Sequence, residues 1–253
     1  MTDLKTTQPQ TKYKILLIGD DCIDVYQYGN VNRISPEAPV PVFTFSHEEC
    51  RPGMAGNVAR NLEALGCDVN YLHGETSTKT RLIDIRSKQQ IVRVDNDVRS
   101  LPLEFITDIP NVYDAVVVSD YDKGTVNYEL IEELIALSIP IFIDTKKTDL
   151  ECMQGAWVKI NELEYSKIKT ECSGLIVTLG SKGAIVPHHD LSFAAPKVEV
   201  SDVCGAGDTF LAALVSEYLA QKDIAPAIEY AIKAASVTVQ HLGVYAPTRE
   251  ELA

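Results

Sequence analysis

Short apolar runs alternate with amphipathic segments along most of the chain. Two of these runs, residues 14–18 and 115–118, are almost wholly apolar, which is typical of strands buried on both faces. Similar runs predict strands at residues 68–72, 141–143, 156–160 and 175–177. Strands that alternate with helices indicate an α/β fold built around a mainly parallel sheet.

Apolar residues recur at helical spacing between and after these strands. The predicted helices cover residues 54–65, 127–137, 206–220 and 224–242. Gly66 and Gly243 follow two of these helices, and Pro140 follows another, which fits because glycine and proline commonly end helices.

Polar residues recur where the apolar runs stop. Asp20, Asp144, Asn161 and Thr178 each follow such a run. The carboxyl ends of strands in an open α/β sheet face the ligand crevice. We therefore expect these side chains to gather at one site.

Two segments, at about 32–48 and 79–96, show β-type alternation with charged residues on one side. They are predicted to form a small sheet that projects from the body as a lid. Residues 1–12 are polar and are predicted to form a disordered tail. Because 45% of the chain is apolar, residues 13–253 can bury one core and are predicted to form one domain.

The chain has a formal net charge of −13, with 23 basic and 36 acidic residues. This balance opposes non-specific binding to nucleic acid, so no nucleic-acid partner is expected. No apolar run approaches a membrane span and the first residues do not resemble a signal peptide, so we expect a cytoplasmic protein without membrane contact. The six cysteines form no C-x-x-C pair, which favours reduced, partly buried thiols over a metal site.

The run 202–208, D-V-C-G-A-G-D, precedes an amphipathic helix and is the strongest candidate for chemistry. Its glycines allow close approach of a ligand to successive N–H groups, and the helix N-terminus adds positive potential at the same point. This suits the charge that spreads over a phosphoryl group during transfer, while Asp208 could accept a proton from a hydroxyl group. A glycine-rich turn that only caps a helix explains these residues about equally well.

Three further motifs are less specific. Asn161 and Glu164 form an N-x-x-E pair that could organise hydrated Mg²⁺ beside phosphates, although a helix-capping asparagine explains them more simply. The T-x-G-x-x-G run that starts at Thr178 could hold a nucleotide's phosphates, but many hairpins share this pattern. Asp20 and Asp24 could bind adjacent sugar hydroxyls, and caps or turns explain them almost as well.

In this order, these elements resemble the PfkB/ribokinase family of carbohydrate kinases. The run 202–208 is similar to the family's C-terminal signature, and R-P-G-M-A-G-N-V-A at 51–59 is similar to its N-terminal one. Within the family, R-I-S-P-E-A-P-V-P-V at 33–42 resembles the heptose 7-phosphate kinases, which form half of a bifunctional enzyme of lipopolysaccharide synthesis. The runs 89–95, 119–124 and 143–146 also resemble that subgroup.

The resemblance implies a ribokinase-like three-layer sandwich with a β-sheet lid and a homodimer formed through that lid. It implies ATP- and Mg²⁺-dependent transfer to the 1-hydroxyl of a heptose 7-phosphate, with a monovalent cation as a further expected cofactor. Asp208 would be the base. The other implied roles are the anion hole (Gly205, Ala206, Gly207), the nucleotide and its metal (Asn161, Thr178, Gly180, Gly183, and Glu164 through water) and the sugar pocket (Asp20, Asp24, Gly53, Asn57).

A sugar 7-phosphate also requires cations. Arg33, Arg51 and Arg81 are candidates on chemistry alone, and solvated lid charges are the alternative.

The chain also departs from the family pattern. Met54 replaces a hinge glycine, Cys204 replaces a threonine, and Lys233 stands where the subgroup carries asparagine near the adenine pocket. Two stretches, at 74–80 and 166–174, are shorter than in the family. These features keep three hypotheses open: a heptose 7-phosphate kinase, a kinase for another sugar, and a decayed kinase that only binds sugar phosphate or nucleotide.

Overall fold

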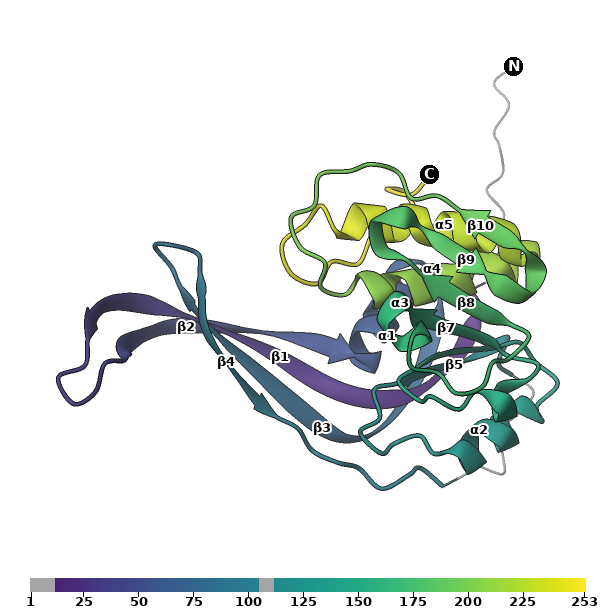
Figure 1. Ribbon diagram of the computed structural model, residues 1–253, viewed down its shortest axis with the longest axis horizontal. Helices are drawn as coiled ribbons and strands as arrows, with labels where there is room; N and C mark the ends of the chain where they lie inside the picture. Colours follow the sequence, from purple (N-terminus) through teal and green to yellow (C-terminus); the bar gives the residue numbers. More distant parts are fainter. Residues whose placement is uncertain (1–11, 105–111) are drawn as a thin grey trace, which may run out of the picture.

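The computed structural model describes residues 12–104 and 112–253, which form a body and a long arm (Figure 1). The arm consists of the outer parts of β1, β2, β3 and β4, which leave the body together and twist as they extend. The predicted tail, residues 1–12, lies outside the described residues except for Lys12.

Within the described residues, one ten-stranded sheet runs through the body and the arm, in the order β10-β9-β8-β7-β6-β5-β1-β3-β4. The central strands pair in parallel, which confirms the predicted mainly parallel sheet, and β2 pairs with β1 in the antiparallel sense. The strands are β1 (Lys14–Ile34), β2 (Pro41–Met54), β3 (Asp68–Asp84), β4 (Gln90–Asn96), β5 (Ala115–Asp120), β6 (Ile141–Thr145), β7 (Trp157–Asn161), β8 (Leu175–Thr178), β9 (Ala184–Val186) and β10 (Leu191–Phe193).

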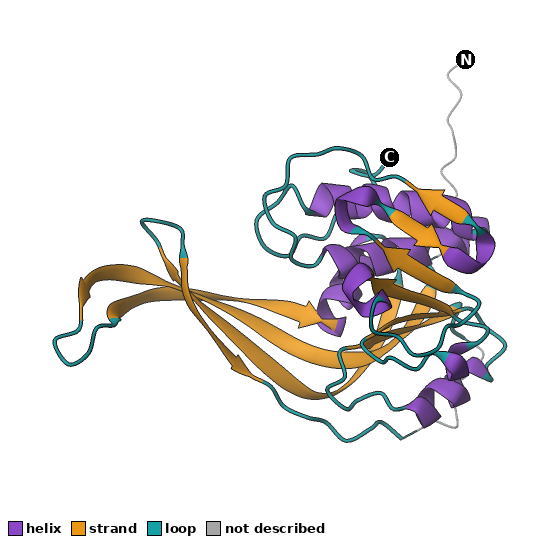
Figure 2. Cartoon of the chain, in the orientation of Figure 1, coloured by secondary structure: helices purple, strands orange, loops and turns teal. Residues whose placement is uncertain are grey.

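Helices cover both faces of the sheet in the body and so complete three layers (Figure 2). Successive strand residues point to opposite faces, so Leu17 packs with α1, α4 and α5, and Leu16 packs with α2. The helices are α1 (Ala55–Ala64), α2 (Tyr128–Ile135), α3 (Glu162–Tyr165), α4 (Ala206–Gln221) and α5 (Ile224–Thr238), with 3₁₀ turns at η1 (Glu151–Met153), η2 (Gly180–Lys182) and η3 (Pro187–His189).

The first strand does not stop at Gly19 and Asp20, as the sequence pattern predicts, but continues from the body into the arm. β3 continues in the same way and pairs with β1 on both sides of one register shift at Gly19/Asp21. The shortened stretch 74–80 is therefore a strand that links body and arm directly. Polar residues interrupt the apolar run within β1, so the sequence pattern did not predict one continuous strand.

The last predicted helix is also shorter than expected, because α5 ends at Thr238 and not at residue 242. The N–H groups of Ser201 and Asp202 donate to the carbonyl of Val239, and the Asp202 carboxylate accepts the N–H of Gly243 at 2.9 Å. These bonds direct the chain away from the helix and tie it to the run 202–208. In residues 12–104 and 112–253, no helix has the length and apolar character needed to cross a membrane.

Candidate active site

The glycine turn lies at the N-terminus of α4, at the carboxyl edge of the central strands. Gly205 has φ 76°, in the left-handed region, and a Cβ built on it would lie 2.8 Å from Asn57 Nδ2. Any other residue there would be strained and would push Asn57 away. The turn thus brings backbone N–H groups, the helix N-terminus and Asp208 to one point, as expected for an anion site.

Asp208 lies in the first turn of α4 and is 6% exposed. Its Oδ2 accepts a hydrogen bond from Asn57 Nδ2 and its Oδ1 accepts one from the Tyr121 hydroxyl, both at 2.8 Å. Burial raises the pKa of Asp208 to about 6 and Asp144 adds to the rise, although the hydrogen bonds oppose it. A carboxylate with such a pKa is ionised at pH 7 and remains basic enough to accept a proton.

A buried ion pair lies beside the turn. Lys159 Nζ donates to Asp144 Oδ2 at 2.6 Å, and the two residues are register partners on β7 and β6. A Cβ built on Gly207 would lie 3.0 Å from Lys159 Nζ, so the ammonium group faces the glycine turn. Asp144 Oδ1 is buried and has no hydrogen-bond partner among the residues that the structure describes. A positive charge and an unsatisfied carboxylate oxygen are therefore held next to Asp208.

On the arm side of the turn lies a smaller, sugar-sized cavity of about 130 Å³. Asp24, a predicted sugar-pocket residue, and Arg81, a predicted cation for the sugar's phosphate, line it and form an ion pair at 2.5 Å. Its lining comprises Asp24, Tyr26, Gly53, Met54, Lys79, Arg81, Tyr121, Cys204, Gly205, Asp208 and Val244. The predicted residue Asn57 is fully buried and contacts Asp208.

Two cationic groups lie over the ring of Tyr26, which lines this cavity. The guanidinium carbons of Arg51 and Arg81 lie 5.1 and 5.2 Å from the centre of the Tyr26 ring, and Lys79 also lines the cavity. Arg33, the third predicted cation, is exposed near the outer end of β1. It lies seven residues beyond Tyr26, or roughly 20 Å along an extended strand.

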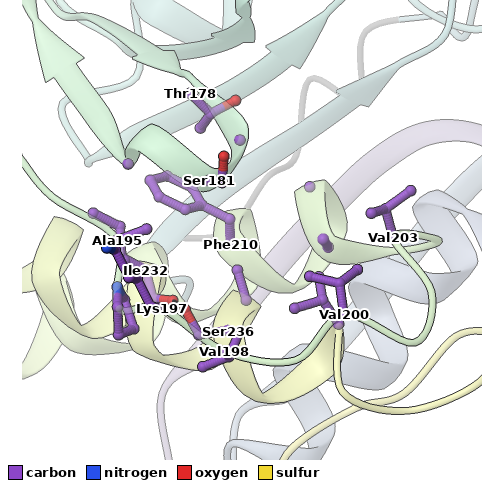
Figure 3. Close-up of a pocket in the computed structure, with 17 residues that line it drawn as sticks. Thr178, Ser181, Ala195, Lys197, Val198, Val200, Val203, Phe210, Ile232 and Ser236 are labelled. Carbon is purple, nitrogen blue, oxygen red and sulfur yellow. Dashed lines mark hydrogen bonds between the residues drawn. The ribbon is translucent and has the colours of Figure 1, made fainter.

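On the other side of the turn, two cavities of about 530 and 670 Å³ share Thr178, Gly180 and Gly207 in their linings. The first is mainly apolar and lies between the 195–203 loop, α4 and α5, with Val198, Phe210 and Ile232 in its wall (Figure 3). The predicted residues Ala206 and Gly183 also line it.

The second cavity lies next to Asp208. It is polar, and its lining includes Asp144, Lys146, Lys159, Asn161 and Asp208.

Gly205, Asp208 and Tyr121 line both this polar cavity and the sugar-sized one. Since the polar cavity also shares Gly207 with the apolar one, the glycine turn joins all three spaces. A nucleotide and a sugar could therefore meet at Asp208.

Asn161 and Glu164 form the helix cap that was the alternative explanation of their motif. The Asn161 side chain accepts the N–H of Glu164 at 2.9 Å, and the Glu164 side chain accepts the N–H of Asn161 at 2.8 Å. The Lys146 ammonium group also donates to Glu164. Capping and ligand binding are compatible here, because Asn161 lines the polar cavity as well.

Asp20, predicted in the sugar pocket, is 1% exposed, and its carboxylate accepts backbone N–H groups. The donors are Tyr121 at 2.7 Å, Lys123 at 3.0 Å and Thr125 at 3.2 Å. Asp20 therefore holds the loop after β5, and with it Tyr121.

The three departures from the family pattern have distinct surroundings. Met54 has φ 49° and ψ −131° at the junction of β2 and α1, a conformation that glycine adopts at lower cost. Cys204 lines the sugar-sized cavity, and burial raises the pKa of its thiol. Lys233 donates to the carbonyls of Leu252 and Ala253 at 2.6 and 3.1 Å.

Sequence reasoning missed Tyr121, Lys146 and Lys159 as site residues, whereas Asp144 was among the strand-end residues expected to gather at one site. The sequence did carry a signal for the missed residues, because Tyr121 and Lys146 follow apolar strands and Lys159 is a charge inside one. That lysine in W-V-K-I-N was the clearest sign, since charged residues are almost never fully buried unless they are paired.

Comparison with known proteins supports the sequence resemblance. The family model described as pfkB family carbohydrate kinase matches residues 151–251. A bifunctional protein HldE of Nitratiruptor sp. is 36% identical over 301 residues and one of Marinomonas sp. is 34% identical over 297, covering 95% and 94% of this chain. The chain spans 64% and 62% of their lengths, less than two thirds.

Solved structures share the fold. Arabidopsis thaliana ribokinase complexed with ribose and ATP aligns with a TM-score of 0.70 at 17% identity, covering 95% of this chain and 97% of that one. Escherichia coli phosphofructokinase-2 in complex with potassium aligns with a TM-score of 0.69 at 16% identity and the same coverages. These likenesses confirm the predicted ribokinase-like sandwich.

Proposed function

We propose that this chain, as a carbohydrate kinase of the pfkB family, transfers the terminal phosphoryl group of ATP to a sugar hydroxyl at the 205–208 turn. Asp208 accepts the hydroxyl proton, and the N–H groups of Gly205, Ala206 and Gly207 stabilise the charge on the moving phosphoryl group. The observation that carries this proposal is that Asp208 lines both the sugar-sized and the polar cavity.

ATP would bind as its Mg²⁺ complex, with the adenine ring in the apolar cavity and the phosphates in the polar cavity. Thr178, Gly180 and Gly183 lie along the nucleotide, and Asn161 and Glu164 serve the phosphates and the hydrated metal. Asp144 Oδ1 fits this assignment, because a buried carboxylate oxygen without a partner can face a hydrated cation. We also propose a monovalent cation as a further cofactor, because phosphofructokinase-2, which shares this fold, has a solved structure in complex with potassium.

The favoured substrate is a heptose 7-phosphate, phosphorylated at its 1-hydroxyl. Two observations support it: two HldE relatives are 36% and 34% identical, and Arg51 and Arg81 lie over the Tyr26 ring, while Lys79 lines the same cavity as Tyr26 and Arg81. In this arrangement Asp24 and Gly53 line the sugar and the cations hold its remote phosphate, because guanidinium groups bind phosphate through paired donors. The proposed reaction places the protein in the cytoplasm, where ATP is made available.

A second candidate is a protein that binds sugar phosphate or nucleotide without turnover. The strained backbone at Met54 favours it, since a side chain there restricts the junction between arm and body. The intact glycine turn and the pKa of about 6 at Asp208 favour the enzyme.

We further propose that two copies pair through their arms. Apolar side chains are exposed there, including Ile34 at 61%, Phe45 at 55% and Val94 at 55%. A second copy would cover them and the unpaired sheet edges. Sedimentation that shows only monomer at high protein concentration would contradict this pairing.

Release of ADP in a coupled assay with a panel of sugars tests the function. Heptose 7-phosphate should be turned over, whereas turnover of only ribose or fructose would overturn the substrate assignment. Failure with every sugar, together with ligand-induced thermal stabilisation, would favour the binding protein. Arg81→Met should raise the KM for the sugar phosphate at least about tenfold, and Arg33→Met, its match on the outer arm, should not change it.

A further inference from the structure

Tyr121 is the residue through which the loop after β5 reaches the base. Its hydroxyl donates to Asp208 Oδ1 at 2.8 Å, and Asn57 donates to Oδ2 from the opposite side, on α1. The carboxylate therefore has one donor on each oxygen and cannot rotate without breaking a bond. One lone pair on each oxygen remains for a substrate proton.

The position of Tyr121 is itself fixed at two points. Its N–H donates to the buried Asp20 carboxylate at 2.7 Å. The Lys146 ammonium group lies 5.1 Å from the centre of the Tyr121 ring, and Lys146 also pairs with Glu164 of the α3 cap. Tyr121 thus connects Asp208 with β1, through Asp20, and with the α3 cap, through Lys146.

The Tyr121 hydroxyl stays protonated, and so remains a hydrogen-bond donor, across the pH range in which Asp208 titrates. Burial and the neighbouring Asp208 and Asp144 carboxylates raise the pKa of Tyr121 well above its ordinary value. A protonated hydroxyl aimed at a carboxylate stabilises its ionised form. The other charged groups lining the two cavities at Asp208 are Asp144, Lys146, Lys159, Glu162, Lys182, Asp24, Lys79 and Arg81.

We propose that Tyr121 is a positioning residue for Asp208, which holds the carboxylate in its ionised form and in the orientation that receives the sugar hydroxyl proton. The inference rests on the proposed kinase function. It explains why Asp20, a carboxylate at the strand end, binds backbone N–H groups: Asp20 anchors the loop that carries Tyr121.

Tyr121→Phe tests the proposal, because it removes the hydroxyl and keeps the ring. The acid limb of the pH profile of kcat/KM should move upward from about 6, since loss of a donor disfavours the ionised carboxylate. A hydrogen bond to a charged group corresponds to a shift of about one to two pH units, so the ionised fraction of Asp208 at pH 7, and with it kcat/KM, should fall about twofold to tenfold. Tyr128→Phe is the matched control and should leave the profile unchanged. The Lys147 ammonium group lies 5.4 Å from the centre of the Tyr128 ring, as Lys146 lies over Tyr121, but Tyr128 is on α2.

A second readout does not depend on turnover. In ¹³C spectra of aspartate-labelled protein, the carboxyl signal that Asp208→Asn removes should titrate near 6 in the wild type and higher in Tyr121→Phe. The proposal would be overturned if Tyr121→Phe lowered the rate but moved neither the acid limb of the kcat/KM profile nor the titration midpoint of the Asp208 signal. Tyr121 would then have only a packing role. Absence of turnover in the wild type would refute the kinase function, while the midpoint would still decide the role of Tyr121.

Discussion

Two buried Lys–Asp pairs lie at the ends of neighbouring strands and differ in what surrounds them. Lys147 pairs with Asp120 at 2.9 Å, and Lys159 pairs with Asp144 at 2.6 Å. In the first pair every carboxylate oxygen is satisfied, because Asp122 N–H and the Thr145 hydroxyl also donate to Asp120. In the second pair, Asp144 Oδ1 has no partner.

The two pairs also face different sides of the sheet. Asp120 alternates with Val118 and so faces the α2 side, where Lys147 also donates to the carbonyl of Val126. Asp144 alternates with Phe142 and so faces the α4 side, beside the glycine turn. The comparison shows two similar ion pairs, of which one has its hydrogen bonds complete and the other leaves a carboxylate oxygen open beside the candidate site.

The largest expected difference is in turnover. Lys159→Met should lower kcat at least about a hundredfold, because one charge aimed at a transferring group contributes 10²–10³. The double variant Asp144→Asn/Lys159→Met removes both charges and should restore stability but not turnover. ADP release measures this, and wild-type turnover in the double variant would remove Lys159 from the reaction.

The next effect is on stability. Lys147→Met should lower the free energy of unfolding by about 3 kcal/mol, because it leaves the Asp120 carboxylate buried without a cation. Below its melting temperature the variant should keep the turnover of the wild type. Urea unfolding and the ADP assay together check this. A variant that is stable but inactive would show that the two pairs are not distinct in function.

The smallest effect is a shift in pH dependence. Asp144 raises the pKa of Asp208 and Lys159 lowers it, so Asp144→Asn should move that pKa below about 6. Since the base acts when ionised, the variant should keep its kcat/KM to lower pH than the wild type does. Asp120→Asn should leave the acid limb in place. An upward shift in Asp144→Asn would contradict this electrostatic account.

The sequence predicts much of the body, because its strands are short apolar runs with clear stops. The same rule failed for β1, where Asp20, Asp21 and Asp24 read as a strand end although the strand continues into the arm. Polar residues can occupy such a strand when partners elsewhere in the chain satisfy them, as the 121–125 loop does for Asp20. Pairing across 100 residues is not visible in a local pattern.

Part of the candidate site is one contiguous motif, and the rest depends on contacts between segments that are far apart in the sequence. The 205–208 turn is contiguous in sequence, and the spacing of its glycines indicated its geometry. Tyr121 and Lys159 act on this turn from other strands, so only the fold reveals that they meet it. Asn57 was assigned to the sugar by resemblance, whereas its contact in the structure is with Asp208 itself.

The most direct test is the rate of ADP formation from ATP and heptose 7-phosphate by Asp208→Asn. The account predicts a fall in kcat of about a hundredfold or more with sugar-phosphate affinity largely retained, because proton transfer contributes 10²–10⁴. A rate close to that of the wild type would show that Asp208 is not the base and would contradict the account.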